Sequence, residues 1–238
     1  MKKIAILILG LAFSMLLRGQ SQEMVEGDSV PWELRKQSFV YNSAKLFSDP
    51  VVARSALYQL IAENPANAAL YDSLAILYLK YDNYVSATLV AQQSLMITPE
   101  NEFAIEIAAA GYDNLGVKDK ATVFYERLYL SNNDINTLYK ISFLQFELGR
   151  YGESNTNLDI VISNPKSETE MIGFPTVDRR GQDVPLKVAA QRVKAMIIEQ
   201  TESKENALKA YLDVLKMYPD FQIVQQQMTE LRKTKDSE

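Results

Sequence analysis

One spacing recurs along this chain and limits its fold more than any other feature. The step from Pro65 to Pro99 equals the step from Ala53 to Ala87 and the step from Ala87 to Ala121. Self-similarity at such a fixed period, here about 34 residues, is typical of repeat proteins, in which each unit packs only on its neighbours. The spacing therefore predicts a stacked array of similar units.

The same markers show one interruption of the period. Ser154 follows Ala121 after nearly the same step, but Ala207 follows Ser154 only after a much longer one. The step from Pro165 to Pro219 is longer than the period by about 20 residues, and the step from Ser154 to Ala207 has a similar excess. Because two independent markers show the same long gap, we place an insertion between the fourth and fifth units.

Each unit has the pattern of two amphipathic helices. In the second unit, Leu70, Leu74 and Leu77 fall at helical spacing. Turn-prone Asn83 then breaks the run, and Pro99 ends the second apolar stripe because its ring disfavours a helical conformation at the preceding residue. The pattern predicts helix, turn and helix within each period.

These residues resemble the tetratricopeptide repeat (TPR). A TPR unit is a helix–turn–helix of about 34 residues with a small residue at its eighth position, an aromatic at the eleventh, Ala at the twentieth and Pro near the thirty-second. Ala75, Tyr78, Ala87 and Pro99 fill these positions in the second unit. The resemblance covers residues 34–221 and implies an all-α, right-handed α-solenoid of about five TPR-like helix pairs. A generic α-helical bundle is the alternative.

The repeats divide the chain, and two further features concern its ends. After the fifth unit, apolar residues at helical spacing predict a capping helix, with Gln227 on its polar outer face. At the other end, we expect Trp32 to cover the open core. The predicted segments are a signal peptide (1–21), a lead-in (22–33), repeats 1–4 (34–165), an inserted loop or β-hairpin (166–185), repeat 5 (186–221), and the capping helix and tail (222–238).

The first segment has the composition of a secretory signal. Lys2 and Lys3 precede an apolar run at 4–17, and Gly19 and Ser21 are small residues spaced like a signal-peptidase site. We expect cleavage near Ser21, with Gly19 as the rival position. A membrane-spanning helix needs about 20 apolar residues. The expected location is therefore periplasmic or otherwise secreted, with no stable membrane span after cleavage; an uncleaved N-terminal membrane anchor is the alternative.

Composition excludes several kinds of chemistry. The chain has no Cys and no His, which rules out Cys nucleophiles, Ser-His-Asp triads and ordinary zinc sites. A net charge of −5 argues against nucleic-acid binding, which needs clustered basic residues. Ser163 and Lys166 match S-x-x-K but lack the other elements of that chemistry. We expect no enzyme activity, no catalytic residue, no metal and no cofactor.

In the TPR family the first helices of the units line a concave groove that binds a protein or peptide partner. The resemblance places Lys45 and Ile76 in that groove, with the alternative that its aromatic residues pack between repeats. The further groove residues that the resemblance implies include Phe39, Asn42, Lys80, Phe103, Tyr139, Lys140, Phe143 and Arg192.

The insertion is the unusual part of the chain. Residues 171–177 favour an extended strand, and the segment 178–181 favours a turn with Gly181 at positive φ. Its apolar residues favour docking onto a partner, and the alternative is that they fold back over the solenoid. The hypothesis is that Arg179 and Arg180 present a cationic tip to an acidic partner.

These patterns together predict a non-enzymatic function. We expect an exported TPR scaffold or adaptor that binds protein or peptide partners through its groove in the bacterial envelope. The alternative is an accessory subunit of an envelope enzyme or of an outer-membrane assembly complex.

Overall fold

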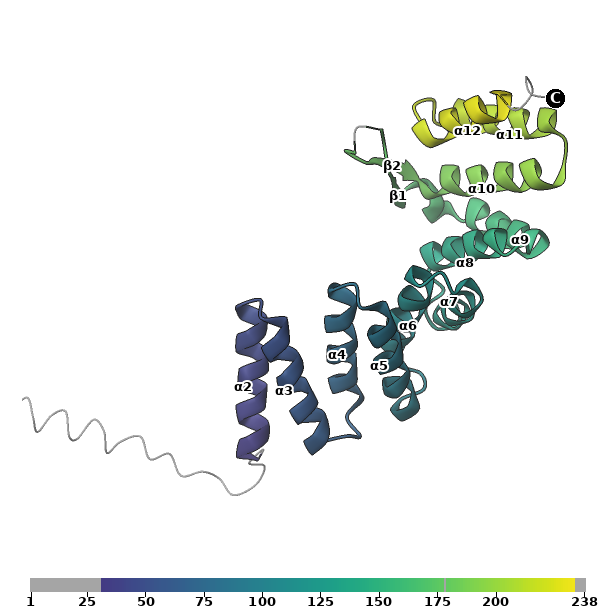
Figure 1. Cartoon of the computed structure of the whole chain (residues 1–238). Helices are drawn as coiled ribbons and strands as arrows, with labels where there is room; N and C mark the ends of the chain where they lie inside the picture. The colour runs from purple at the N-terminus through teal and green to yellow at the C-terminus, as the bar shows by residue number, and fades with distance from the viewer. Residues whose placement is uncertain (1–30, 178, 234–238) are drawn as a thin grey trace, which may run out of the picture.

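The fold was obtained as a computed structural model, which describes residues 31–177 and 179–233. Figure 1 shows helix pairs stacked one after another, with the helix axes turning along the array. The predicted all-α solenoid with an inserted hairpin and a capping helix is therefore confirmed. The predicted signal peptide lies outside the described residues.

Helix pairs follow one another at the predicted units, and a short insertion separates the last two pairs. The pairs are α2 (Trp32–Leu46) with α3 (Pro50–Glu63), α4 (Ala68–Lys80) with α5 (Tyr84–Ile97), α6 (Glu102–Asn114) with α7 (Lys118–Asn132), α8 (Ile135–Glu147) with α9 (Tyr151–Ser163), and α10 (Leu186–Thr201) with α11 (Lys204–Met217). The insertion contains η1 (Pro165–Glu168), β1 (Met171–Phe174) and β2 (Gln182–Pro185), and α12 (Gln222–Lys233) follows the last pair.

Side-chain caps fix where most of these helices begin. The carboxylate of Asp49 accepts hydrogen bonds from the backbone N–H groups of Val51 and Val52, which the first turn of a helix leaves without a partner. Asn67, Asn83, Asn101, Asp134 and Ser203 make the same kind of cap on α4, α5, α6, α8 and α11. Local sequence therefore sets the helix boundaries that the repeat period predicts.

The small residues that mark the period lie where two helices of a pair cross. Ala53, Ala87, Ala121 and Ala207 are buried. Ser154 takes this place in the fourth pair, and its hydroxyl donates a hydrogen bond to the carbonyl of Ser142, at 2.7 Å. Because a larger side chain would push the two helices apart, these positions preserve the close packing of each pair.

The core is a string of clusters, as expected for an array in which each unit contacts only its neighbours. Leu57 and Leu74 pack together where α3 meets α4. Leu158 and Val193 belong to a cluster that joins the fourth and fifth pairs. Phe221 belongs to another cluster that joins the fifth pair to the hairpin and α12.

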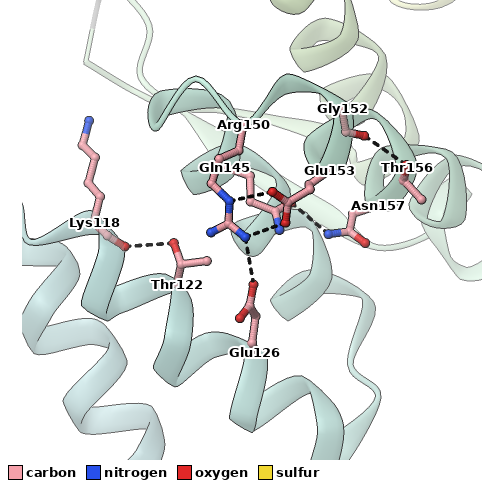
Figure 2. A network of polar contacts seen from close by, with 9 residues as sticks. All are labelled: Lys118, Thr122, Glu126, Gln145, Arg150, Gly152, Glu153, Thr156 and Asn157. Carbon is pink, nitrogen blue, oxygen red and sulfur yellow. Dashed lines mark hydrogen bonds and ion pairs between the residues drawn. The ribbon is translucent and has the colours of Figure 1, made fainter.

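Polar contacts add to the packing between the third and fourth pairs (Figure 2). The guanidinium of Arg150 donates to Glu153 of α9 and lies 3.9 Å from a carboxylate oxygen of Glu126 of α7. Asn157 of α9 donates to Gln145 of α8, at 2.9 Å. Of these contacts, the ion pair between Arg150 and Glu126 joins the third pair to the fourth, and the other two lie within the fourth pair.

The insertion is an antiparallel hairpin in which Met171 pairs with Pro185 and Phe174 with Gln182. The ring of Phe174 meets the ring of Phe221 edge to face, with centroids 4.9 Å apart. The amide of Gln182 donates to the carbonyl of Asp220, at 2.6 Å. The apolar side of the hairpin thus folds back over the solenoid, which was the alternative for the insertion, while Met171 and Val177 remain exposed.

Two expectations about the ends of the array are wrong. Trp32 is 63% exposed and does not cover the core. Gln227, expected on the outer face of α12, turns inward and accepts a hydrogen bond from Arg192, at 2.9 Å. A buried guanidinium needs a polar partner, which draws this glutamine toward the core.

Candidate functional site

Part of the predicted groove gathers around one hollow, which we call the hairpin pocket. It has a volume of about 200 Å³ and lies between α8, α10 and the hairpin. Its lining residues are Tyr139, Lys140, Phe143, Ile172, Phe174 and Arg192. Four of the six were predicted from the sequence as groove residues.

Two rigid helices and a braced hairpin hold these side chains in place. Tyr139, Lys140 and Phe143 lie on α8, so that the first and last are one helical turn apart. Arg192 comes from α10, and Phe174 is the last residue of β1. The hairpin therefore closes a space that two successive first helices alone would leave open.

Arg192 is a buried cation rather than a residue of an open groove, which corrects the expectation for it. It is 7% exposed, its guanidinium lies 5.6 Å from the centre of the Phe174 ring, and its Nε donates to Gln227. Burial lowers the pKa of Arg192, although arginine remains charged in proteins. The pocket thus has a permanent positive charge beside an aromatic face.

Tyr139 is likewise enclosed, at 8% exposed. Burial raises the pKa of its phenol to about 12, so the hydroxyl stays protonated at neutral pH. The neighbouring Lys140 has an ion-pair partner on the preceding unit, with Nζ 2.6 Å from Oδ2 of Asp113. Of the two cations that line the pocket, Lys140 has a carboxylate partner, and Arg192 forms no ion pair with a described residue.

A second hollow, which we call the N-terminal pocket, lies where α2 and α3 meet α4. Its volume is about 260 Å³, and Ala44, Ile76 and Leu77 contribute to an apolar lining. Lys45 and Lys80 stand in the same lining, and neither forms an ion pair with another described residue. Of the residues predicted for the groove, this pocket brings together Lys45, Ile76 and Lys80.

The other predicted residues line neither pocket. Phe39 and Asn42 are exposed on α2, and Phe103 is exposed on α6. Arg179 and Arg180 are exposed at the hairpin turn, where Arg179 has a φ of +62° and Gly181 a φ of +80°. The structure does not join these residues into one site.

Sequence reasoning missed the hairpin wall of the first pocket. Ile172 and Phe174 were seen as apolar residues of the insertion, but no groove position was assigned to them. Their alternate spacing along a strand was a usable signal, because residues two apart on a strand share one face. Local sequence does not predict how β1 is oriented relative to α8 and α10.

Two kinds of feature are absent from the described residues. Among the helices in 31–177 and 179–233, none is long and apolar enough to cross a membrane. The same residues contain no group of three or more acidic side chains placed to hold a metal ion.

Comparison with known proteins gives similarity in structure only. No family model matches the sequence, and no curated protein does either. The solved structure of a tetratricopeptide repeat protein from Parabacteroides merdae matches with a TM-score of 0.64 and 17% identity, covering 84% of this chain and 73% of that one.

Two further solved structures have the same architecture. YrrB, described as a TPR protein with an unusual peptide-binding site, matches with a TM-score of 0.63 and 14% identity over 79% of this chain and 88% of that one. A MamA structure matches with a TM-score of 0.59 and 13% identity, covering 77% of this chain and 91% of that one. This chain therefore has the fold of these TPR structures, an α-solenoid of stacked helix pairs.

Proposed function

We propose that this protein is an adaptor that binds segments of partner proteins carrying apolar side chains next to acidic ones. The observation that supports it most strongly is that each of two hollows on the solenoid combines an apolar lining with cationic side chains. The peptide-binding site described for YrrB, which has the same fold, also supports it.

The size of the pockets favours side chains over whole small molecules. Ligand pockets usually measure about 300–1,000 Å³. The N-terminal pocket and the hairpin pocket are smaller, at about 260 Å³ and 200 Å³. Each therefore suits one large apolar side chain from a longer segment that remains on the surface, which is how a peptide is anchored at a few points.

The charges of the pockets favour an acidic segment. Lys45 and Lys80 form no ion pair with another described residue, and Asp49, the carboxylate in the same lining, accepts hydrogen bonds from the first turn of α3. Arg192 provides a buried positive charge in the hairpin pocket. Since the whole chain carries a net charge of −5, we expect these cations to orient a bound acidic peptide rather than to attract it from a distance.

Selection from a random-peptide display library on the purified protein tests this proposal. We expect the enriched peptides to place Phe, Tyr or Leu next to Asp or Glu. In a titration with one enriched peptide, the double change Lys45→Ala and Lys80→Ala should weaken binding by about tenfold or more, as removal of an interface anchor does. Lys209→Ala on α11 is the matched control, because Lys209 is exposed and lines neither pocket.

A separate change tests the hairpin pocket. Ile172→Ala enlarges that pocket and removes apolar contact area, so the affinity for peptides that bind there should fall severalfold while peptides specific for the N-terminal pocket keep theirs. Enriched peptides without the acidic and apolar pattern, or affinities that none of the three pocket changes alters, would contradict the proposal.

The proposal includes export to the bacterial envelope, supported by the basic start and the apolar run of the segment that ends at Ser21. Mass spectrometry of the protein recovered from cells after expression tests it. An N-terminus at Gln22 indicates cleavage after Ser21, and one at Gln20 indicates cleavage after Gly19. An intact chain in the membrane fraction would instead support an N-terminal anchor.

A further inference from the structure

The outer face of α2 carries a stripe of large apolar side chains that nothing in the described structure covers. Trp32, Phe39 and Leu46 are 63%, 73% and 78% exposed. They are seven residues apart, close to two helical turns, so they lie along one side of the helix. Phe47, also exposed, extends this α2 stripe at its C-terminal end.

The repeat period accounts for the central residue of this stripe. Two full periods after Phe39 stands Ile107, at the same position of the third unit. Ile107 is buried in a cluster with Ala75 and Ala87 of the preceding unit. Phe39 thus occupies a position that the third unit buries against its predecessor, and no described residue of a preceding unit covers it here. The residues two periods after Trp32 and Leu46, Glu100 and Asn114, are exposed, so the apolar character of those two positions belongs to the first unit.

The other end of the array differs in chemistry. On α12, Gln225, Gln226 and Glu230 are exposed, so the outer surface of the capping helix is polar. Stacking one molecule head to tail on another would place the apolar α2 stripe against these polar side chains and leave them without water. An interface with apolar side chains on both sides therefore requires the α2 stripes of two copies to face each other.

We propose that the α2 stripe binds the α2 stripe of a second copy, with the two helices antiparallel about a two-fold axis near Phe39. Trp32 and Leu46 are both seven residues from Phe39, so in this register Trp32 of each copy lies level with Leu46 of the other. Such a self-complementary, isologous contact is the commonest arrangement of homodimers.

The charged residues of α2 agree with this register. Arg35 and Lys36 come level with Ser43 and Asn42 of the second copy, which are polar and uncharged. Like charges therefore do not face each other across the axis. In a parallel arrangement Arg35 would face Arg35 of the second copy and Lys36 would face Lys36, and the repulsion between like charges is unfavourable.

The area of the stripe suits a weak, reversible dimer. An aromatic side chain buries about 150–250 Å², so the four apolar side chains of the stripe supply on the order of 500 Å² per copy. A stable interface takes about 800 Å² per partner. The aliphatic stems of Arg35 and Lys36, which flank the stripe, supply further contact.

The dimer uses a different side of α2 from the N-terminal pocket. Ala44 and Lys45, which line that pocket, lie five and six residues after Phe39. At about 3.6 residues per turn this places both more than a quarter turn away from the stripe. A variant that loses dimerisation is therefore expected to keep peptide binding, so the two proposals can be tested separately.

Sedimentation analysis of the purified protein over a dilution series tests the proposal, with the only tryptophan of the chain as an internal reporter. We expect a reversible monomer–dimer equilibrium in which Trp32 fluorescence shifts to the red on dilution. Phe39→Glu should weaken dimerisation by about 30-fold or more, as expected when a central interface anchor is lost. Leu130→Glu on α7 is the matched control, because Leu130 is exposed far along the chain from the stripe.

The register has its own test. Leu46→Glu should weaken the dimer, and adding Trp32→Lys should restore part of the loss, because opposite charges then lie level in an antiparallel pair. In a parallel pair the double variant would dimerise more weakly than the single one. A protein that stays monomeric at every concentration, or a dimer that Phe39→Glu and Leu130→Glu affect equally, overturns the proposal.

Discussion

The two ends of this solenoid consist of the same kind of helix pair and differ in what covers them. At the N-terminal end, α2 exposes Trp32, Phe39 and Leu46. At the C-terminal end, Tyr211 and Phe221 are buried beneath the hairpin and α12. The repeat sequence therefore determines the fold of each unit, and contact with neighbouring elements determines which of its apolar residues are buried.

The largest expected difference between the ends concerns two phenylalanines. Phe221 is fully buried and contacts the rings of Phe174 and Tyr218, so Phe221→Ala should lower the free energy of unfolding by about 3–5 kcal/mol. Phe39→Ala, at the exposed end, should change it by no more than about 0.5 kcal/mol. Urea unfolding under conditions where the protein is monomeric measures both. Equal losses for the two variants would contradict the comparison.

Two glycines test the same principle inside the array. A methyl group on Gly111 of α6 would overlap Oγ1 of Thr88 on α5, so Gly111→Ala should lower the free energy of unfolding by about 1–3 kcal/mol. Gly152 of α9 has open space around its Cα, so Gly152→Ala should be neutral or stabilise the protein.

A second change separates a clash from a helix effect at Gly111. If contact with Thr88 is the cause, Thr88→Ala should recover part of the stability lost by Gly111→Ala, as a double-mutant cycle measures. Strict additivity of the two changes would show that another interaction is responsible.

Much of this architecture could be predicted from local sequence, for identifiable reasons. The spacing of Ala53, Ala87 and Ala121 reports helix crossings that recur in every unit, and the long step from Ser154 to Ala207 located the insertion. The same period placed Tyr139 and Phe143 on a first helix, where they now line a pocket.

The remaining features depend on contacts that no local pattern records. The direction in which Phe174 points is set by docking of the hairpin on Phe221, which lies beyond two further helices of the chain. Gln227 turns inward because Arg192 is buried opposite it. Trp32 is exposed because no other described residue covers its side of α2, and local sequence does not record that contact.

A smaller effect is expected at the boundary between the first two pairs. The hydroxyls of Tyr58 on α3 and Tyr78 on α4 are 2.7 Å apart. Tyr58→Phe removes this hydrogen bond at a half-exposed site and should cost about 0.5–1 kcal/mol. Hydrogen exchange should show faster exchange in α2 and α3 alone. Tyr81→Phe is the control, because no hydrogen bond of its hydroxyl joins it to another described residue.

The smallest effect at neutral pH concerns Tyr139, which lies beneath the hairpin. Its pKa is raised to about 12 by burial, above the ordinary value of about 10. Unfolded chains therefore lose this proton first as the pH rises, and stability should fall between about pH 10 and pH 12 with no change at pH 7. Tyr139→Phe should flatten this decline in urea unfolding measured at several alkaline pH values, and an unchanged decline would contradict the assignment.

The hairpin has a consequence for how the molecule comes apart. In a simple array each unit can open without disturbing any unit beyond its neighbour. Here Ile172 packs on the cluster of the fourth pair while Val184 is buried with α12, so the hairpin ties α8 to the last helix. When the chain is pulled from both termini, α2 and α3 should unfold in an early step at low force. The elements after α8, including the hairpin and α12, should then unfold together in one larger step.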